Sequence, residues 1–264
     1  MSEVSGRWGD LASRLFSGVV MAFAGVLSIH FGGSWFLTLI VIVTGIMCWE
    51  LTAMNAPRSR WRALPAGFLA AGLLLAGLRG GAGWTTLMLF APIAAIAGSM
   101  PRDRMIYGAV FSVLLLAGYG LVAFRDVQGG AWLFWLVLVV IVTDVFGYFA
   151  GRLIGGPKLC PAISPKKTWT GAVAGWLGAA GVGAVFQIFA HADHDVIWIS
   201  VILSFASQMG DIAESALKRR WGVKDSSNLI PGHGGLFDRF DGLLGAALFM
   251  LLAMVIVGVP QVRF

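Results

Sequence analysis

Apolar stretches about as long as a membrane-spanning helix follow one another along almost the whole chain, with short polar segments between them. The stretches lie at 15–31, 35–54, 64–79, 82–99, 107–123, 131–150, 170–190, 196–213 and 242–259. Crossing the hydrocarbon core of a bilayer takes about 20 helical residues, and most of these stretches come close to that length. The pattern predicts an all-α integral membrane protein with about nine transmembrane helices.

The amino-acid composition argues against a soluble domain. Of the 264 residues, 58% are hydrophobic and 12% are charged, and the mean hydropathy is +0.83. A soluble domain of this size carries roughly 25% charged residues. The excess of apolar side chains must therefore face lipid, and we expect a single membrane domain.

The positive charges predict which way the helices run. If the N-terminus is cytoplasmic, sixteen of the 19 lysines and arginines fall in cytoplasmic segments. Basic residues are enriched on the cytoplasmic side of membrane proteins, so this bias favours an N-terminus inside and a C-terminus outside. The net charge of +6 then lies mostly on one face, beside anionic lipid headgroups.

Acidic residues interrupt three of the apolar spans: Glu50 in the second, Asp144 in the sixth and Asp211 in the eighth. A charge in the middle of a membrane costs around 3 kcal/mol on insertion scales, so such residues usually have a partner or a function. Asp144 lies in the cytoplasmic half of the sixth span. It is either functional or tied to Arg152 or a helix end. Glu50, in the second span, is interpreted as structural and paired with an arginine of the following loop.

The loop 151–171 contains three prolines and four basic residues, which end the sixth helix. We expect its segment 164–168, Ser-Pro-Lys-Lys-Thr, to open the seventh span. The start of a helix offers unpaired N–H groups and a positive dipole end, which suit a phosphate. The alternative is that the lysines are only the usual cytoplasmic anchors.

The segment 204–242 carries the strongest chemical signal. At helical spacing, its polar side chains form one stripe, which consists of Ser207, Gln208, Asp211, Glu214, Ser215 and Lys218. Asp211 should therefore face a polar interior. The turn 231–235 contains three glycines, which permit close approach of a ligand. Asp238 and Asp241 then enter the last span three residues apart.

Aspartates without a cluster of cysteine or histidine are the hard oxygen ligands that Mg²⁺ prefers. Lysines, arginines and glycine N–H groups can hold phosphates. The combination is typical of nucleotidyl or phosphoryl transfer. The alternative is a charged cytoplasmic loop held by salt bridges.

Because the polar residues gather after residue 140, we expect residues 1–130 to be scaffold helices. Residues 131–264 would form the catalytic region, with cytoplasmic loops 151–169 and 214–241.

The same segment resembles the signature of the phosphatidate cytidylyltransferases, also called CDP-diacylglycerol synthases. The match covers 27 consecutive positions: Ser215-x-Leu217-Lys218-Arg219, four residues, Lys224-Asp225-x-Ser227, two residues, then Ile230-Pro231-x-His233-Gly234-Gly235-Leu236-x-Asp238-Arg239-Phe240-Asp241. The Asp144 segment and the segment 164–168 are also similar to family elements and occur in the expected order. One departure is Thr170, where relatives often have glutamate.

The resemblance implies an enzyme in which a phosphatidic acid oxygen attacks the α-phosphorus of CTP, releasing pyrophosphate and forming CDP-diacylglycerol. It implies Mg²⁺ as cofactor, with K⁺ or Mg²⁺ as a second cation, and a homodimer in contact with membrane lipids. No nucleic-acid partner is expected. The implied location is a bacterial plasma (inner) membrane, with several membrane passes and the active site facing the cytoplasm.

Carried over residue by residue, the resemblance implies three groups of site residues. The catalytic group is Asp211, Asp238 and Lys218. The metal ligands are Asp211 and Asp238, with Asp144 and Asp241 as weaker candidates. The substrate-binding group is Ser164, Lys166, Lys167, Arg219, Lys224, His233 and Arg239.

Two other functions stay open from the sequence. A transporter could also place buried acids at broken helices, but it would predict acids nearer the bilayer centre and two related halves. The second alternative is a related CTP-using enzyme that acts on another lipid acceptor, such as a polyprenol or an ether lipid.

We predict that Asp211→Asn or Asp238→Asn abolishes turnover and leaves the protein folded in the membrane, because each change removes a carboxylate ligand. Activity and membrane insertion of the purified variants check this. Near-normal activity in either variant would contradict its assignment as a metal ligand.

Overall fold

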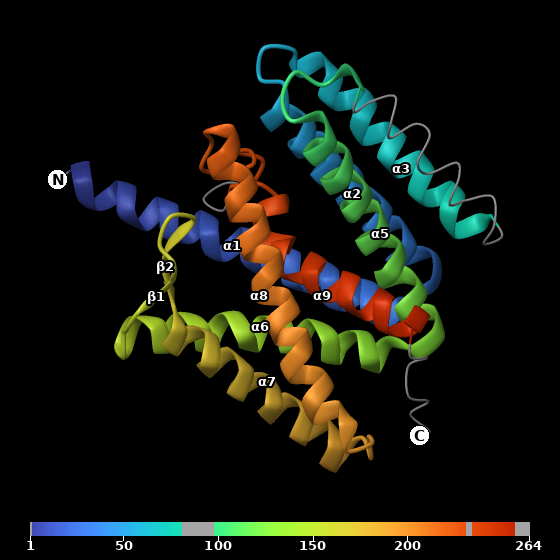
Figure 1. The fold of residues 1–264 in the computed structure, drawn as a ribbon, viewed down its shortest axis with the longest axis vertical. Coiled ribbons are helices and arrows are strands. Elements are labelled where there is room, and N and C mark those ends of the chain that lie inside the picture. The colour runs from blue at the N-terminus through green and yellow to red at the C-terminus, as the bar shows by residue number, and fades with distance from the viewer. Residues whose placement is uncertain (1, 81–97, 231–233, 257–264) are drawn as a thin grey trace. The chain divides into compact units, whose positions relative to one another are not determined.

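The computed structural model describes residues 2–80, 98–230 and 234–256, and most of these residues are helical (Figure 1). Seven helical segments within these ranges are long and apolar enough to cross a membrane. They are Gly33–Asn55, Arg60–Arg79, Arg104–Gln128, Gly130–Leu153, Trp169–Phe189, Asp195–Trp221 and Phe237–Ile256. The predicted class, an all-α multi-pass membrane protein, is confirmed at this level.

The helices lie at the positions that the apolar stretches predicted, with two differences. The first stretch is part of α1 (Ser2–Phe31), whose apolar portion, Ser17–Phe31, is shorter than the seven candidate spans. The fourth expected stretch, 82–99, lies almost entirely outside the described residues. The count of nine spans and the orientation of the two termini therefore stay predictions.

The chain divides into two compact units. The first consists of Met1–Val122 and Trp221–Phe240, and the second consists of Ala123–Arg220 and Asp241–Phe264. The boundaries fall inside helices and differ from the division at residue 130 that the sequence suggested. That division concerned scaffold and catalytic roles, and it stays a prediction.

In the first unit, α2 (Gly33–Asn55) packs closely against α3 (Ala63–Arg79) (Figure 1). Gly45 and Gly67 make the approach possible, because a Cβ at Gly67 would lie 2.9 Å from the Gly45 carbonyl oxygen. Small residues commonly allow such contacts between membrane helices. The buried Thr52 hydroxyl shares a 2.8 Å hydrogen bond with the hydroxyl of Tyr107, joining α2 to α5 (Arg104–Gln128).

The second unit contains α6 (Gly130–Leu153), α7 (Trp169–Phe189), most of α8 (Asp195–Trp221) and most of α9 (Phe237–Ile256). The α6 and α7 helices meet at a glycine pair, since a Cβ at Gly171 would lie 2.6 Å from the Gly147 carbonyl oxygen. A 2.8 Å hydrogen bond from the Thr143 hydroxyl to Ser204 joins α6 to α8. These contacts bring three helices of this unit together around the polar residues described below.

Between α6 and α7 the chain forms a short hairpin of two antiparallel strands, β1 (Lys158–Cys160) and β2 (Ser164–Thr168). The segment Ser164–Thr168 leads into the seventh helix as expected, but the sequence did not indicate that it would form a strand. Pro165 disfavours helical backbone at the residue before it, and the segment pairs with β1 instead. Helix α7 begins at Trp169, and the Thr168 hydroxyl caps it by accepting a 3.2 Å hydrogen bond from the Gly171 N–H.

We predict that Gly67→Ala lowers the thermal unfolding midpoint in detergent, by an amount corresponding to roughly 1–3 kcal/mol, because the added methyl group meets backbone that cannot move aside. Gly72→Ala on the same helix is the matched control. Nothing lies within 4 Å of a Cβ there, and alanine favours a helix more than glycine does. Equal midpoints for the two variants would contradict close glycine packing of α2 and α3.

Candidate functional site

A cavity of about 590 Å³ lies in the second unit, between α6, the β-hairpin, the start of α7 and α8. Its charged lining residues are Asp144, Arg152, Lys158, Lys166, Lys167 and Asp211. Glycines leave part of this space open, because Gly147, Gly151 and Gly171 lack side chains where α6 and α7 approach each other. The cavity therefore brings the loop lysines and the membrane aspartates, predicted separately from the sequence, to one place.

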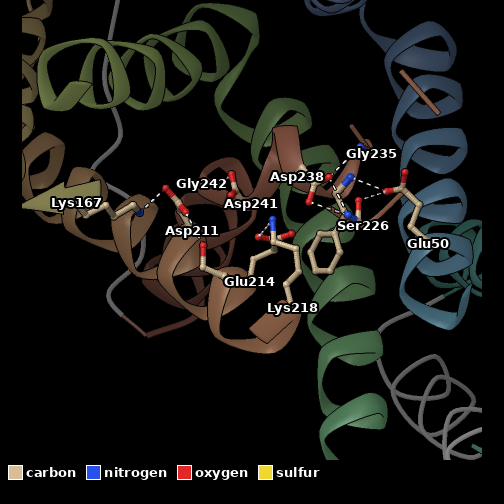
Figure 2. A network of polar contacts seen from close by, with 12 residues as sticks. Glu50, Lys167, Asp211, Glu214, Lys218, Ser226, Gly235, Asp238, Asp241 and Gly242 are labelled. Atoms are coloured by element: carbon tan, nitrogen blue, oxygen red, sulfur yellow. Dashed lines mark hydrogen bonds and ion pairs between the residues drawn. The ribbon is translucent and has the colours of Figure 1, made fainter. Parts of the chain in front are cut away.

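Asp211 makes the central polar contact of this cavity. One of its carboxylate oxygens forms an ion pair with the Lys167 ammonium, which the β-hairpin supplies (Figure 2). The other oxygen accepts a 3.4 Å hydrogen bond from the Ser215 hydroxyl, one turn along α8. Both Lys167 and Asp211 are half-buried, so their charges are less screened than they would be in water.

Two further carboxylates lie close enough to Asp211 and Lys167 to interact with their charges. Asp144 of α6 and Asp241 of α9 each interact electrostatically with Asp211 and with Lys167. The backbones of α8 and α9 are in close contact here, because a Cβ on Gly210 would meet the carbonyl oxygen of Asp241. The cluster therefore brings carboxylates from three helices close to one lysine.

The polar stripe predicted on α8 lies on the protected side of that helix. Ser207 and Glu214 are buried, whereas Phe205 and Met209 are exposed on the other side. Lys218, predicted to be catalytic, forms a 2.7 Å ion pair with Glu214 one turn earlier. Glutamate N-terminal to lysine at this spacing is the favourable order in a helix.

In the first unit, the segment 222–236 between α8 and α9, here called the signature loop, folds back onto Asp238. Both carboxylate oxygens of Asp238 accept from the Ser226 N–H, at 3.1 and 2.9 Å, and one also accepts from the Gly235 N–H at 2.9 Å. Ile230 and Gly234 form a two-bond antiparallel bridge. The φ of Gly234 is 83°, a left-handed conformation that favours glycine.

These bonds give Asp238 a structural task that the sequence did not indicate. Its role as a metal ligand stays a prediction, since a carboxylate has more acceptor sites than three N–H bonds use. Loss of activity in Asp238→Asn would therefore report on the signature loop as well as on any bound metal. Asp211→Asn is the cleaner test of the metal assignment.

The sequence did not predict the partners of Glu50 correctly. The expected arginine partner was wrong: its carboxylate accepts from the hydroxyls of Ser226 and Ser227 and from the N–H groups of Leu236 and Phe237. An acid in an apolar span signalled that a partner must exist. The partners are more than 170 positions away in the chain, so no local pattern could identify them.

The other predicted site residues differ in their positions and exposure. Ser164 and Lys166 lie on β2, and Lys166 lines the cavity. Arg219, Lys224 and Arg239 have exposed side chains, and His233 lies outside the described residues. Arg152 and Lys158 also line the cavity, although the sequence had marked them only as basic residues of a cytoplasmic loop. At Thr170, the departure from the family pattern, the hydroxyl donates to the Gly155 carbonyl.

The cluster suits a divalent cation by its chemistry. Carboxylate oxygens are the ligands that Mg²⁺ prefers, and it usually keeps several waters and needs only one or two carboxylates. Among the described residues, no three His, Cys, Asp or Glu side chains stand close enough to hold a metal ion by themselves. In this structure, the positive charge beside Asp211 comes from the Lys167 ammonium, which forms an ion pair with it.

Comparison with known proteins identifies the family of the chain. A sequence model described as the cytidylyltransferase family matches residues 12–257. The chain therefore belongs to the cytidylyltransferase family.

Its relatives carry a more specific name. A phosphatidate cytidylyltransferase of Brucella abortus is 37% identical over 238 residues, which cover 88% of this chain and 76% of that protein. One of Bacillus subtilis is 42% identical over 134 residues, or 49% of this chain and 50% of the relative. One of Staphylococcus epidermidis is 40% identical over 144 residues, or 52% and 55%. The family that the signature predicted is confirmed.

We predict that Lys218→Met lowers the unfolding free energy by on the order of 3 kcal/mol, because it leaves the buried Glu214 charge without this lysine. Thermal unfolding in detergent measures the change. The double variant Glu214→Gln/Lys218→Met should recover most of the stability, because the Glu214 charge is removed together with that of Lys218. If the double variant is stable but inactive, Lys218 has a role beyond the ion pair. An unchanged midpoint in the single variant would show that the pair does not stabilise α8.

Proposed function

We propose that this protein transfers the cytidylyl group of CTP to phosphatidic acid, giving CDP-diacylglycerol and pyrophosphate. The observation that carries the proposal is the cavity containing Asp144, Asp211 and Lys167, in a chain that matches the cytidylyltransferase family over residues 12–257. Relatives named phosphatidate cytidylyltransferase, at 37–42% identity, support phosphatidic acid as the acceptor.

In the proposed reaction, a phosphate oxygen of phosphatidic acid forms a bond to the α-phosphorus of CTP. The bond between that phosphorus and the oxygen leading to the β-phosphate breaks, and pyrophosphate leaves with the electron pair. The attacking phosphate is already ionised, so no serine or cysteine nucleophile is required. The chain's main contributions are positioning the two phosphates and balancing their charge, which dominate catalysis of phosphoryl transfer.

The basic residues of the cavity supply the positive charge. Arg152, Lys158, Lys166 and Lys167 line it and suit the triphosphate of CTP. Lys167 is paired with Asp211 in this structure, and a bound triphosphate would compete for its ammonium. We propose that Arg219, Lys224, His233 and Arg239 bind further phosphate oxygens, as the signature implies.

We propose Mg²⁺ as the cofactor, held by Asp211, with Asp144 and Asp241 as alternative further ligands that share its electrostatic environment. When bound, it would neutralise charge on the phosphates of CTP. Asp238 stays a predicted ligand from the signature. A second cation, K⁺ or Mg²⁺, belongs to the same proposal and would neutralise the remaining negative charge of the acids.

The membrane setting follows from the two substrates. CTP is water-soluble and phosphatidic acid lies in the bilayer, so the reaction must occur where a polar cavity meets lipid. We propose a bacterial inner membrane with the cavity on the cytoplasmic side, which is where the basic residues are expected. A homodimer is part of the same proposal.

We predict that the purified protein in detergent releases pyrophosphate only when CTP, phosphatidic acid and Mg²⁺ are all present, and that a CDP-lipid appears in equal amount. Omitting each component in turn, and adding a chelator, should reduce release to background. Asp211→Asn serves as the inactive control. Pyrophosphate release with a polyprenyl phosphate or an ether lipid, but not with phosphatidic acid, would show that the acceptor is that other lipid. No release from folded protein with any of these lipids would contradict nucleotidyl transfer.

A further inference from the structure

The first unit holds a buried acid that the proposed reaction does not use. Glu50 of α2 is fully buried, and both of its carboxylate oxygens are engaged (Figure 2). One oxygen accepts from the Ser227 hydroxyl at 2.5 Å and from the Leu236 N–H at 2.9 Å. The other accepts from the Ser226 hydroxyl at 3.3 Å and from the Phe237 N–H at 2.7 Å.

These four donors connect two parts of the family signature. Ser226 and Ser227 precede residues 231–233 in the chain, whereas Leu236 and Phe237 follow them. The N–H groups of Leu236 and Phe237 also belong to the start of α9, where a helix has no acceptors of its own. A negative charge at that end is favoured by the helix dipole. Glu50 therefore caps α9 from another helix and joins both sides of the signature loop.

Two acids hold the loop from different helices. Asp238, within α9, accepts from the backbone N–H of Ser226, while Glu50 accepts from the hydroxyl of the same serine (Figure 2). Gly235 leaves the space for this arrangement, because a Cβ there would collide with the Ser226 hydroxyl and would lie 2.5 Å from a Glu50 oxygen. The need for glycine at 235 is thus explained by a contact within the protein, apart from any ligand.

A carboxylate is the group that these contacts require. Each oxygen faces one backbone N–H, which can only donate, and one hydroxyl, which can also accept. A glutamine would turn an NH₂ group toward one of the two backbone N–H groups, whichever way its amide lay. An unsatisfied buried donor is costly, so the loop would have to move away on that side.

We propose that Glu50 is a positioning residue for cytidylyl transfer, which fixes the signature loop and the start of α9 in the arrangement that the substrates require. This inference rests on the proposed function for its catalytic consequence. The structural part, the restraint of Leu236 and Phe237 by a carboxylate from α2, stands independently of which reaction the protein catalyses.

The test compares Glu50→Gln with Thr52→Val. Thr52 lies on the same helix, is equally buried, and bonds to the Cys48 carbonyl and to Tyr107, away from the signature loop. Thermal midpoints are measured first, and activity is then measured at a temperature where both variants are fully folded. Hydrogen exchange in peptides that contain Leu236 and Phe237 gives a readout independent of activity.

We expect Glu50→Gln to lower kcat/KM for CTP by roughly tenfold or more and to speed exchange at Leu236 or Phe237, as loss of a charge-assisted hydrogen bond would do. Thr52→Val should lower the midpoint while keeping near-normal activity and exchange in these peptides. Activity losses that follow the midpoint equally in both variants, or unchanged exchange in Glu50→Gln, would overturn the proposal.

Gly235→Ala tests the same contact from the loop side and covers the case in which Glu50→Gln does not fold. The added methyl group should push apart the Ser226 hydroxyl and the Glu50 carboxylate, and we expect the same fall in kcat/KM and the same rise in exchange. Wild-type-like activity and exchange in this variant would overturn the proposal. If the wild-type protein does not transfer a cytidylyl group, the proposed function fails, and the exchange comparison still decides whether Glu50 holds the loop.

Discussion

A carboxylate placed in an apolar helix needs hydrogen-bond donors or a cation, and meeting this need organises the polar interior of each unit. In the first unit, Glu50 draws two serine hydroxyls and two backbone N–H groups around itself. In the second unit, Asp211 pairs with Lys167 and Glu214 pairs with Lys218. Isolated charges are expensive in apolar surroundings, so these contacts determine where loops attach to helices.

The two groups of acids differ in what satisfies them. Glu50 and Asp238 accept from N–H and O–H groups of the signature loop, so their bonds restrain the chain. Asp144, Asp211 and Asp241 interact electrostatically with one another and with Lys167 beside the cavity. Restraint is what a positioning residue supplies, and carboxylate oxygens are the ligands that a cation such as Mg²⁺ prefers. The division of tasks is consistent with nucleotidyl transfer, in which positioning and charge neutralisation carry most of the catalysis.

Close helix packing in both units depends on glycine pairs. Gly45 and Gly67 meet between α2 and α3, and Gly147 and Gly171 meet between α6 and α7. The second pair lies beside the cavity, so the same small residues that bring the helices together also leave room for a ligand. Small residues at such positions are a common means of association in membranes, where apolar burial alone does not favour helix contacts.

The sequence by itself determined the membrane class, the positions of most helices, the family and the candidate acids, because these depend on local hydropathy and on residues close together in the chain. It did not indicate the strand pairing of Ser164–Thr168 with Lys158–Cys160, which depends on a contact between two loop segments. Only the tertiary structure decided the partner of Glu50 and the pairing of Lys167 with Asp211. Both contacts join segments far apart in the chain, and which donor reaches a buried carboxylate is set by how helices pack.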